Sequence, residues 1–191
     1  VFVNAAGCMT LLSVYPFTPF RGSWLYTAMA SAPAGAQGIR DALDILKEQD
    51  RLPDEEDMEV VVLTGDGAAY GMGLSATSGA IERNLDFLYV CYDNEGYGNT
   101  GQQYSGATPH GALTSTSRGP AGFRGHKKPL FDIWAAHQPA YVATVIGSEP
   151  LDLARKIEKA GNIHGPRLII ALSPCPTGWD FDPRLTVEVG R

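Results

Sequence analysis

The stretch VVLTGDGAAYGMG, residues 61–73, passes from aliphatic residues into Gly-Asp-Gly and then into small residues that suit a helix. A short apolar run bounded by turn residues is typical of a buried strand. The glycines after it mark a turn, and the residues beyond them allow a helix to begin. The stretch therefore predicts a strand, a turn and a helix, with Asp66 at the end of the strand.

Four more apolar runs alternate with helix-compatible segments along the chain. We predict five strands in all, at Val1–Asn4, Glu59–Thr64, Phe87–Tyr92, Ala140–Ile146 and Arg167–Leu172. We predict helices at Ala34–Gln49, Gly73–Arg83, Leu130–His137 and Pro150–Lys159. Strands that are apolar on both faces and alternate with helices indicate an α/β fold with a doubly wound, mostly parallel sheet.

Two connecting segments differ in character. The charge-rich segment Lys47–Glu59, with a central proline, predicts a solvated connection into the next strand. The segment Asp93–Lys128 is rich in Gly, Thr, Ser, Asn and Pro. A long ordered loop inside a compact domain is more often functional than idle. We therefore expect the second segment to contribute to a binding site.

Length and composition limit the classes of function. With 191 residues, of which 44% are hydrophobic and 19% charged, the chain is long enough for a single domain. A net charge of −6 provides no basic surface for nucleic acid. No apolar stretch reaches the ~20 residues of a membrane span, and no signal peptide is recognisable. We expect a cytoplasmic protein, and a segment of a longer polypeptide because its first residues already resemble a buried strand.

Two strand ends carry the oxygen ligands of a candidate metal site. The segments GDG (65–67) and DNEG (93–96) follow successive predicted strands, and ligands of open α/β sheets bind at the carboxyl ends of strands. Asp66 offers a carboxylate, Asn94 an amide oxygen and Gly96 a carbonyl, a set that suits Mg²⁺ shared with phosphates. The glycines allow close approach of a diphosphate beside a helix start. A lone Gly-Asp-Gly, however, more often marks a plain turn.

The spacing of these segments resembles a known cofactor motif. GDG, 26 intervening residues and then Asn94 is similar to the motif that binds thiamine diphosphate (thiamine pyrophosphate, TPP). GDGAAYGMGLSATSGAIERNLDFLYVCYDNEGYGNTGQQYSGATPHGA, residues 65–112, resembles the β subunit of pyruvate:ferredoxin oxidoreductase and related 2-oxoacid:ferredoxin oxidoreductases. The resemblance extends from VNAAGC (3–8) to SPCPTGW (173–179). It implies a TPP-binding fold and an enzyme that oxidatively decarboxylates a 2-oxoacid, releases CO₂ and passes electrons to ferredoxin.

The resemblance also implies roles for individual residues. Asp66 and Asn94 would ligate Mg²⁺ through their side chains, and Gly96 through its carbonyl. Asn99 would lie near the thiazolium and the bound 2-oxoacid, where an amide donor stabilises developing oxygen charge; a turn-forming Asn beside Gly98 is the alternative. The diphosphate would be lined by Gly65, Gly67, Ala68 and Thr100.

The resemblance also implies partner polypeptides, because this sequence does not supply the activating glutamate or all four thiolates of the family's iron-sulfur cluster. The glutamate that activates TPP in this family belongs to another domain or subunit, so we expect obligate association with at least one other polypeptide. A [4Fe-4S] cluster in the family is held by a CxxC pair and by cysteines that match Cys8 and Cys175. Four thiolates are the normal requirement, so this segment would supply two of them. Cys91 lies inside a predicted strand and is interpreted as a core residue.

The segment Tyr15–Gly35 is expected to border the substrate pocket. Arg21 is a candidate counter-ion for a substrate carboxylate, although packing on an aromatic neighbour such as Trp24 suits an arginine equally well. Pyruvate enzymes of the family carry an acidic residue and an amide where this chain has Ala30 and Ser31. Loss of a nearby carboxylate favours a more anionic substrate, which makes oxalate an alternative to pyruvate.

Two other functions stay open. A non-oxidative TPP-dependent decarboxylase or lyase would share Gly-Asp-Gly and Asn94 but would leave Cys8 and Cys175 unexplained. A non-catalytic assembly module would contain neither TPP nor iron. The histidines do not add a metal site, because His110, His126, His137 and His164 are scattered without metal-ligand spacing. The sequence does not decide whether coenzyme A accepts the acyl group.

Overall fold

The computed structural model describes residues 1–52 and 58–191. Its strands form one six-stranded sheet in the order β2-β1-β3-β4-β6-β5, and every neighbouring pair is parallel. The strands are β1 (Phe2–Ala5), β2 (Trp24–Thr27), β3 (Val61–Gly65), β4 (Phe87–Asp93), β5 (Tyr141–Ile146) and β6 (Pro166–Leu172). The predicted α/β fold with a parallel sheet is confirmed.

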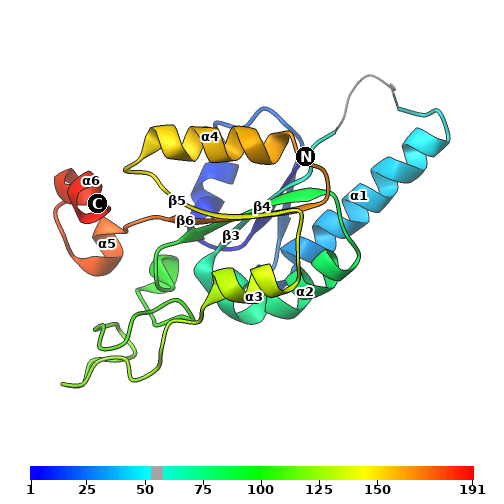
Figure 1. Cartoon of the computed structure of the whole chain (residues 1–191). Coiled ribbons are helices and arrows are strands. Elements are labelled where there is room, and N and C mark those ends of the chain that lie inside the picture. Colours follow the sequence, from blue (N-terminus) through cyan, green and yellow to red (C-terminus); the bar gives the residue numbers. More distant parts are fainter. Residues whose placement is uncertain (53–57) are drawn as a thin grey trace.

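Helices cover both faces of the sheet (Figure 1). On one face lie α1 (Ala32–Glu48), α2 (Leu74–Glu82) and α3 (Leu130–Ala136), and on the other lies α4 (Pro150–Gly161). The larger core includes Ala36 of α1, Trp134 of α3 and Val62 of β3. A smaller core includes Ala160 of α4 and Ile169 of β6. Apolar residues on both faces of the central strands are therefore buried, as a parallel sheet requires.

Shorter helical segments complete the fold. They are η1 (Cys8–Ser13), η2 (Met29–Ser31), the π-helical η3 (Gly67–Met72), η4 (Gly98–Thr100), α5 (Pro176–Trp179), η5 (Pro183–Leu185) and α6 (Thr186–Val189). Within residues 1–52 and 58–191, no helix combines the length and apolar character needed to cross a membrane.

The structure contains all the predicted strands and helices, with ends shifted by no more than two residues. It adds β2, an edge strand held by parallel pairing with β1. It also begins the helical path after Gly-Asp-Gly earlier than predicted, at Gly67 rather than Gly73, because η3 precedes α2. Part of the predicted solvated connection Lys47–Glu59, namely residues 53–57, lies outside the described residues.

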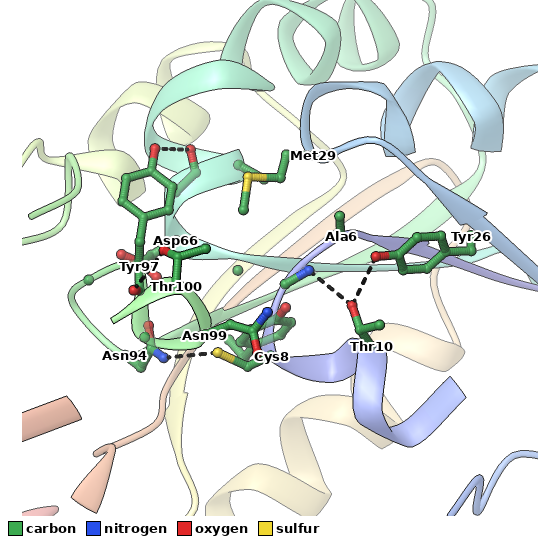
Figure 2. Close-up of a pocket in the computed structure, with 17 residues that line it drawn as sticks. Ala6, Cys8, Thr10, Tyr26, Met29, Asp66, Asn94, Tyr97, Asn99 and Thr100 are labelled. Carbon is green, nitrogen blue, oxygen red and sulfur yellow. Dashed lines mark hydrogen bonds between the residues drawn. The ribbon is translucent and has the colours of Figure 1, made fainter. Parts of the chain in front are cut away.

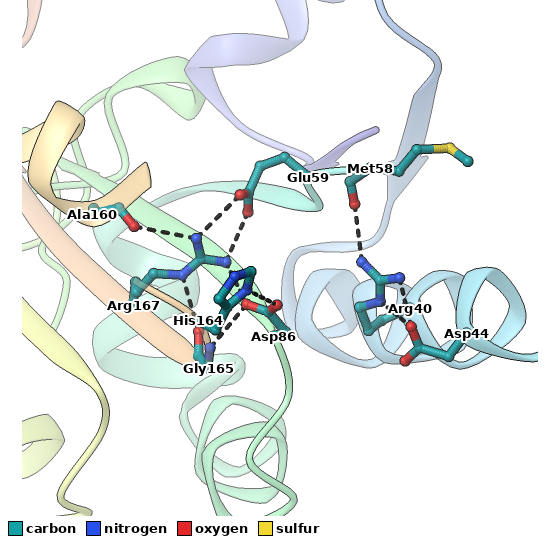
Figure 3. Close-up of polar contacts among 9 residues, drawn as sticks. All are labelled: Arg40, Asp44, Met58, Glu59, Asp86, Ala160, His164, Gly165 and Arg167. Carbon is teal, nitrogen blue, oxygen red and sulfur yellow. Dashed lines mark hydrogen bonds and ion pairs between the residues drawn. The ribbon is translucent and has the colours of Figure 1, made fainter. Parts of the chain in front are cut away.

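A buried arginine ties together the elements at the amino end of the sheet (Figure 3). Arg167, only 2% exposed, donates Nε to the Gly165 carbonyl at 3.0 Å and Nη1 to the Ala160 carbonyl at 3.2 Å. Both Nη atoms donate to the Glu59 carboxylate, at 3.1 and 2.9 Å, and Nη2 also donates to Asp86 at 2.8 Å. All five guanidinium donors are thus satisfied, and they join α4 and β6 to the segments before β3 and β4.

Candidate functional site

A cavity of about 230 Å³ lies at the carboxyl ends of β1, β3 and β4 (Figure 2). The segments that follow these three strands reach it, and the segment from β2 to η2 adds Tyr26 and Met29. The lining residues are Ala6, Gly7, Cys8, Thr10, Tyr26, Met29, Gly65, Asp66, Gly67, Ala68, Tyr92, Asn94, Gly96, Tyr97, Gly98, Asn99 and Thr100. The structure therefore brings together nine of the predicted site residues, namely Cys8, Gly65, Asp66, Gly67, Ala68, Asn94, Gly96, Asn99 and Thr100.

Three oxygen atoms converge at the floor of this cavity. Asn94 Oδ1 lies 2.8 Å from Asp66 Oδ1 and 2.7 Å from the carbonyl oxygen of Gly96. Acceptors this close repel one another unless a donor or a cation joins them. Turning the Asn94 amide would bring its NH₂ group to both oxygens. A Mg²⁺ ion is the other solution, because neighbouring ligands of an octahedron with bonds of about 2.05 Å stand about 2.9 Å apart. The donor set thus fits a small, hard cation.

Asp66 is a buried carboxylate without a counter-charge of its own. It is 1% exposed, and no Lys or Arg in the described part of the chain forms an ion pair with it. Its Oδ2 atom accepts a hydrogen bond from Ser105 Oγ. Burial raises the pKa of Asp66 to about 7; the Ser105 hydrogen bond opposes this shift and the charge of Asp93 adds to it. A cation beside Oδ1 would supply the missing positive charge.

Asp93, the second buried carboxylate at this edge, is fully compensated. It accepts from Tyr70 Oη at 2.6 Å and from the Glu95 backbone N–H at 3.0 Å. Lys127 Nζ pairs with Asp93 at 2.8 Å and with Glu95 at 2.8 Å. Burial alone would lower the pKa of Lys127, but these carboxylates raise it overall. Asp93 therefore holds the end of the long loop through Lys127, whereas Asp66 lines the cavity.

Gly67 has a steric requirement beyond that of a turn. A Cβ atom at this position would lie 2.0 Å from the Tyr97 ring. The Tyr97 hydroxyl donates to the Gly67 carbonyl at 3.4 Å, as Figure 2 shows. The ring thus lies directly on the Gly67 backbone and forms one wall of the cavity, so that only glycine fits there.

Two of the three cysteines lie near this site. Cys8 lines the cavity, and its Sγ accepts from Asn94 Nδ2 at 3.6 Å. Burial raises the pKa of the Cys8 thiol, although hydrogen bonds from Asn99 and Asn94 oppose the shift, and Cys175 is close enough to contribute to it. Cys175 does not line the cavity; it precedes α5, and its Sγ accepts from the Gly178 N–H at 3.3 Å. Cys91 is fully buried in β4, which confirms its interpretation as a core residue.

Arg21 is not brought to the cavity. Its side chain is exposed, and it precedes β2, whereas Tyr26 near the opposite end of that strand lines the cavity. Trp24 packs instead on the Phe2 and Phe20 rings, with centroids 5.6 and 4.7 Å away. The position of Arg21 therefore does not support the predicted contact with a substrate carboxylate in this cavity.

Several lining or supporting residues were not singled out by sequence reasoning. Tyr97 and Ser105 come from the loop that was expected to be functional, but its composition does not indicate which hydroxyl points inward. Met29 and Tyr26 come from the segment expected to border the pocket. Over the described ranges, no group of three or more His, Cys, Asp or Glu residues could hold a metal ion, so a cation site here depends on amide and carbonyl oxygens as well as on Asp66.

Residues 5–171 match the family model described as thiamine pyrophosphate enzyme, C-terminal TPP binding domain. The chain belongs to this family. The TPP-binding domain is 43% identical over 195 residues to pyruvate synthase subunit PorB of Methanocaldococcus jannaschii, covering 100% of this chain and 65% of that subunit. It is 39% identical over 197 residues to ketoisovalerate oxidoreductase subunit VorB of Pyrococcus abyssi, covering 100% of this chain and 62% of that subunit.

A solved structure extends the likeness. The 2-oxoglutarate:ferredoxin oxidoreductase from Magnetococcus marinus, determined with 2-oxoglutarate, coenzyme A and succinyl-CoA bound, matches the TPP-binding domain with a TM-score of 0.77 and 25% identity. The match covers 98% of this chain and 57% of that chain. The domain thus spans less than two thirds of these relatives. Together they confirm the resemblance to subunits of 2-oxoacid oxidoreductases.

Proposed function

We propose that this domain binds TPP and Mg²⁺ within a 2-oxoacid:ferredoxin oxidoreductase, which decarboxylates a pyruvate-like 2-oxoacid and passes the electrons to ferredoxin. The observation that carries the proposal is the convergence of oxygens from Asp66, Asn94 and Gly96 in the cavity of a TPP-binding domain. The names of the relatives support the reaction class, because pyruvate, ketoisovalerate and 2-oxoglutarate are all 2-oxoacids.

Residues of this chain would hold the cofactor by its charged end. When bound, TPP supplies the nucleophilic carbon for the 2-oxo group and the electron sink for the loss of CO₂. Asp66, Asn94 and the Gly96 carbonyl would ligate the Mg²⁺ that neutralises the diphosphate. The diphosphate itself would be approached by Gly65, Gly67, Ala68 and Thr100. All of them line the cavity beside the converging oxygens, which supports this assignment.

Asn99 is the proposed catalytic residue of the chain. Its amide would donate a hydrogen bond to an oxygen of the bound 2-oxoacid and stabilise the charge that develops there. Asn99 lines the same cavity as Asp66 and Asn94. That common location supports a role at the substrate over a role as a turn former alone.

The site is expected to be completed by another polypeptide. A cavity of about 230 Å³ is smaller than the ~300–1,000 Å³ of typical cofactor sites, so the domain encloses only part of a TPP molecule. The activating glutamate would come from the partner. Cys8 and Cys175 would supply two of the four thiolates of a [4Fe-4S] cluster. The contact of Cys8 Sγ with Asn94 Nδ2 at 3.6 Å supports a short path for electrons leaving the site.

Oxalate is the less favoured substrate. The prediction rested on Ala30 and Ser31, which are not among the residues lining the cavity. The relatives named above carry the names of 2-oxoacid enzymes, and none of the three names oxalate. A non-oxidative decarboxylase would share the cation site but would not explain two cysteines beside it.

The test uses the full-length protein in its native complex, purified without oxygen. Iron-sulfur absorbance is followed after addition of pyruvate, ketoisovalerate, 2-oxoglutarate or oxalate, first with TPP and Mg²⁺ and then after both are removed. We expect TPP-dependent bleaching with a 2-oxoacid. Bleaching with oxalate alone would overturn the substrate class. A complex that contains neither TPP nor iron would overturn the proposed function.

A further inference from the structure

We propose that Ser105 is a positioning residue of the cation site, which fixes the Asp66 carboxylate so that one oxygen stays free for the metal. The inference rests on the proposed function, because it requires a cation at Asp66 Oδ1. Ser105 belongs to the long loop after β4 and lies 39 residues beyond Asp66 in the sequence. Its side chain is 3% exposed, so its hydroxyl must find its partners inside the protein.

The hydrogen bonds around Ser105 leave its hydroxyl a single role. The Ala107 backbone N–H donates to Ser105 Oγ at 3.0 Å. A serine hydroxyl carries one hydrogen, and the Asp66 carboxylate is the acceptor toward which it points. Ser105 therefore accepts from the loop backbone and donates to Asp66 Oδ2, and this direction cannot be reversed without losing a buried hydrogen bond.

The same bond assigns different roles to the two oxygens of Asp66. Oδ2 is occupied by Ser105, while Oδ1 lies 2.8 Å from the Asn94 amide oxygen, which in turn lies 2.7 Å from the Gly96 carbonyl oxygen. The terminal torsion of an aspartate has broad minima, so an unrestrained carboxylate would rotate between several orientations. Mg²⁺ requires near-ideal octahedral geometry. Holding Oδ2 therefore pre-organises Oδ1 for the cation, in the way that hydrogen bonds to ligating carboxylates commonly do.

Ser105 is itself held by the segment that carries the other two oxygens. Its backbone N–H donates to Thr108 Oγ1 at 2.9 Å, and that hydroxyl donates to the Glu95 carbonyl at 2.6 Å. Glu95 lies between Asn94 and Gly96. The turn at residues 105–108 thus connects the end of β3, through Asp66, with the end of β4. We infer that closure of the loop and alignment of the three oxygens depend on each other.

The experiment measures metal affinity in the full-length protein within its complex, after removal of bound metal. Mn²⁺ replaces Mg²⁺ as a paramagnetic probe, and its binding is titrated by electron paramagnetic resonance with TPP present. We expect Ser105→Ala to weaken Mn²⁺ binding by about 10–100-fold and to change the spectrum of the bound ion. Ser105→Thr, which keeps the hydroxyl, is expected to recover most of the affinity.

Ser115→Ala is the matched control, because Ser115 lies in the same loop and its buried Oγ has no hydrogen-bond partner among the described residues. It is expected to leave Mn²⁺ affinity unchanged. Melting with and without Mn²⁺ separates binding from folding, since a ligand raises stability only as far as it binds the folded state. Equal affinity in wild type and Ser105→Ala, or an equal loss in Ser115→Ala, would overturn the inference. Failure of the wild type to bind Mn²⁺ would instead overturn the proposed function.

Discussion

Asp66 shows how a single residue can favour ligand binding over stability. It is buried without an ion-pair partner among the described residues, and burial raises the pKa of its carboxyl group, although the charge of Lys127 acts in the opposite direction. A buried charge without a partner destabilises a folded protein unless something neutralises it. Binding of a divalent ion offsets this unfavourable free energy, because the positive charge of the ion neutralises the carboxylate.

Asp66→Asn should therefore separate binding from stability. The asparagine has the same shape but no charge, so we expect the metal-free protein to melt no lower than wild type. We expect Mn²⁺ and TPP binding to weaken by at least about 100-fold. Calorimetric titration and thermal melting measure the two effects. Asp41→Asn, a change on the exposed face of α1, is the control, and unchanged Mn²⁺ binding in Asp66→Asn would contradict the assignment.

Gly67→Ala tests the contact between the Gly-Asp-Gly turn and Tyr97. Its Cβ would lie 2.0 Å from the Tyr97 ring, so the ring must move and the cavity must change shape. Overpacking of this kind costs about 1–3 kcal/mol, measured by urea unfolding, and TPP binding should weaken. At Gly71 a Cβ would lie 3.8 Å from the Tyr97 hydroxyl, so Gly71→Ala should be tolerated. Equal effects at both positions would show that Tyr97 does not restrict Gly67.

At the level of residues, the sequence was informative where chemistry and spacing coincide. Asp66, Asn94 and Gly96 follow successive strands, and parallel strands bring their carboxyl ends to one edge. Ser105 could not be predicted in this way, since one of many loop hydroxyls reaches Asp66 only through the tertiary fold. The contact of Arg21 with a substrate carboxylate stays a prediction for a related reason: a guanidinium suits a carboxylate, but its chemistry does not say at which end of β2 it lies.

At the level of elements, the longer apolar strands, including the edge strand β5 (Tyr141–Ile146), were easier to predict than the short edge strand β2. The central strands are continuous apolar runs because both faces are covered. β2 has only four residues, two of them exposed, and exists because its backbone pairs with β1. η3 was missed because glycines usually interrupt helices, whereas here Gly67 is required by Tyr97 and small residues follow it.

The amino end of the sheet depends on Arg167, which joins α4, β6 and the segments before β3 and β4. Arg167→Met would leave Glu59 and Asp86, which are 41% and 32% exposed, without their shared partner. Loss of hydrogen bonds that involve a charged group costs about 1.5–3 kcal/mol. We expect that loss in urea unfolding of the full-length protein. Arg155→Met, on the exposed side of α4, should change stability by less than about 0.5 kcal/mol. Similar losses in both variants would mean that the Arg167 contacts contribute little.

The same network predicts acid sensitivity. Burial would raise the pKa of Asp86, but hydrogen bonds from His164 and Gly165 and the charge of Arg167 lower it overall, below its usual 3.8. The folded state therefore favours the ionised carboxylate. Its stabilisation is present above about pH 4 and is lost as the pH falls through the folded pKa. Asp86→Asn should cost about 1 kcal/mol near neutral pH and less at pH ~3. A cost that stays constant with pH would contradict this account.

At the level of the whole molecule, the carboxylates at the two ends of the sheet strands differ in their partners. At the amino end of the strands, every guanidinium N–H of Arg167 has a hydrogen-bond acceptor, and Glu59 and Asp86 share its charge. The carboxyl edge carries Asp66 without a counter-charge and Gln102, whose buried amide has no partner among the described residues. Violations of polar satisfaction tend to mark functional sites. The contrast supports a site at the carboxyl edge that is completed by cofactors and a partner polypeptide.

The two cysteines at this edge allow a test of that assembly. Cys8 follows β1 and Cys175 follows β6, and the charge of Cys175 contributes to raising the pKa of Cys8. The fold therefore brings together two segments that are far apart in the sequence. If both are cluster ligands, Cys8→Ser and Cys175→Ser should each remove about four iron atoms per protein while TPP binding persists. The control is Cys91→Ala, in the β4 core, for which the iron content of the complex should equal that of wild type. Elemental analysis gives the iron content, and electron paramagnetic resonance of the reduced complex detects the cluster. Full iron content in both serine variants would show that the cluster takes all of its thiolates from elsewhere, and that this domain contributes to binding TPP but not to conducting electrons.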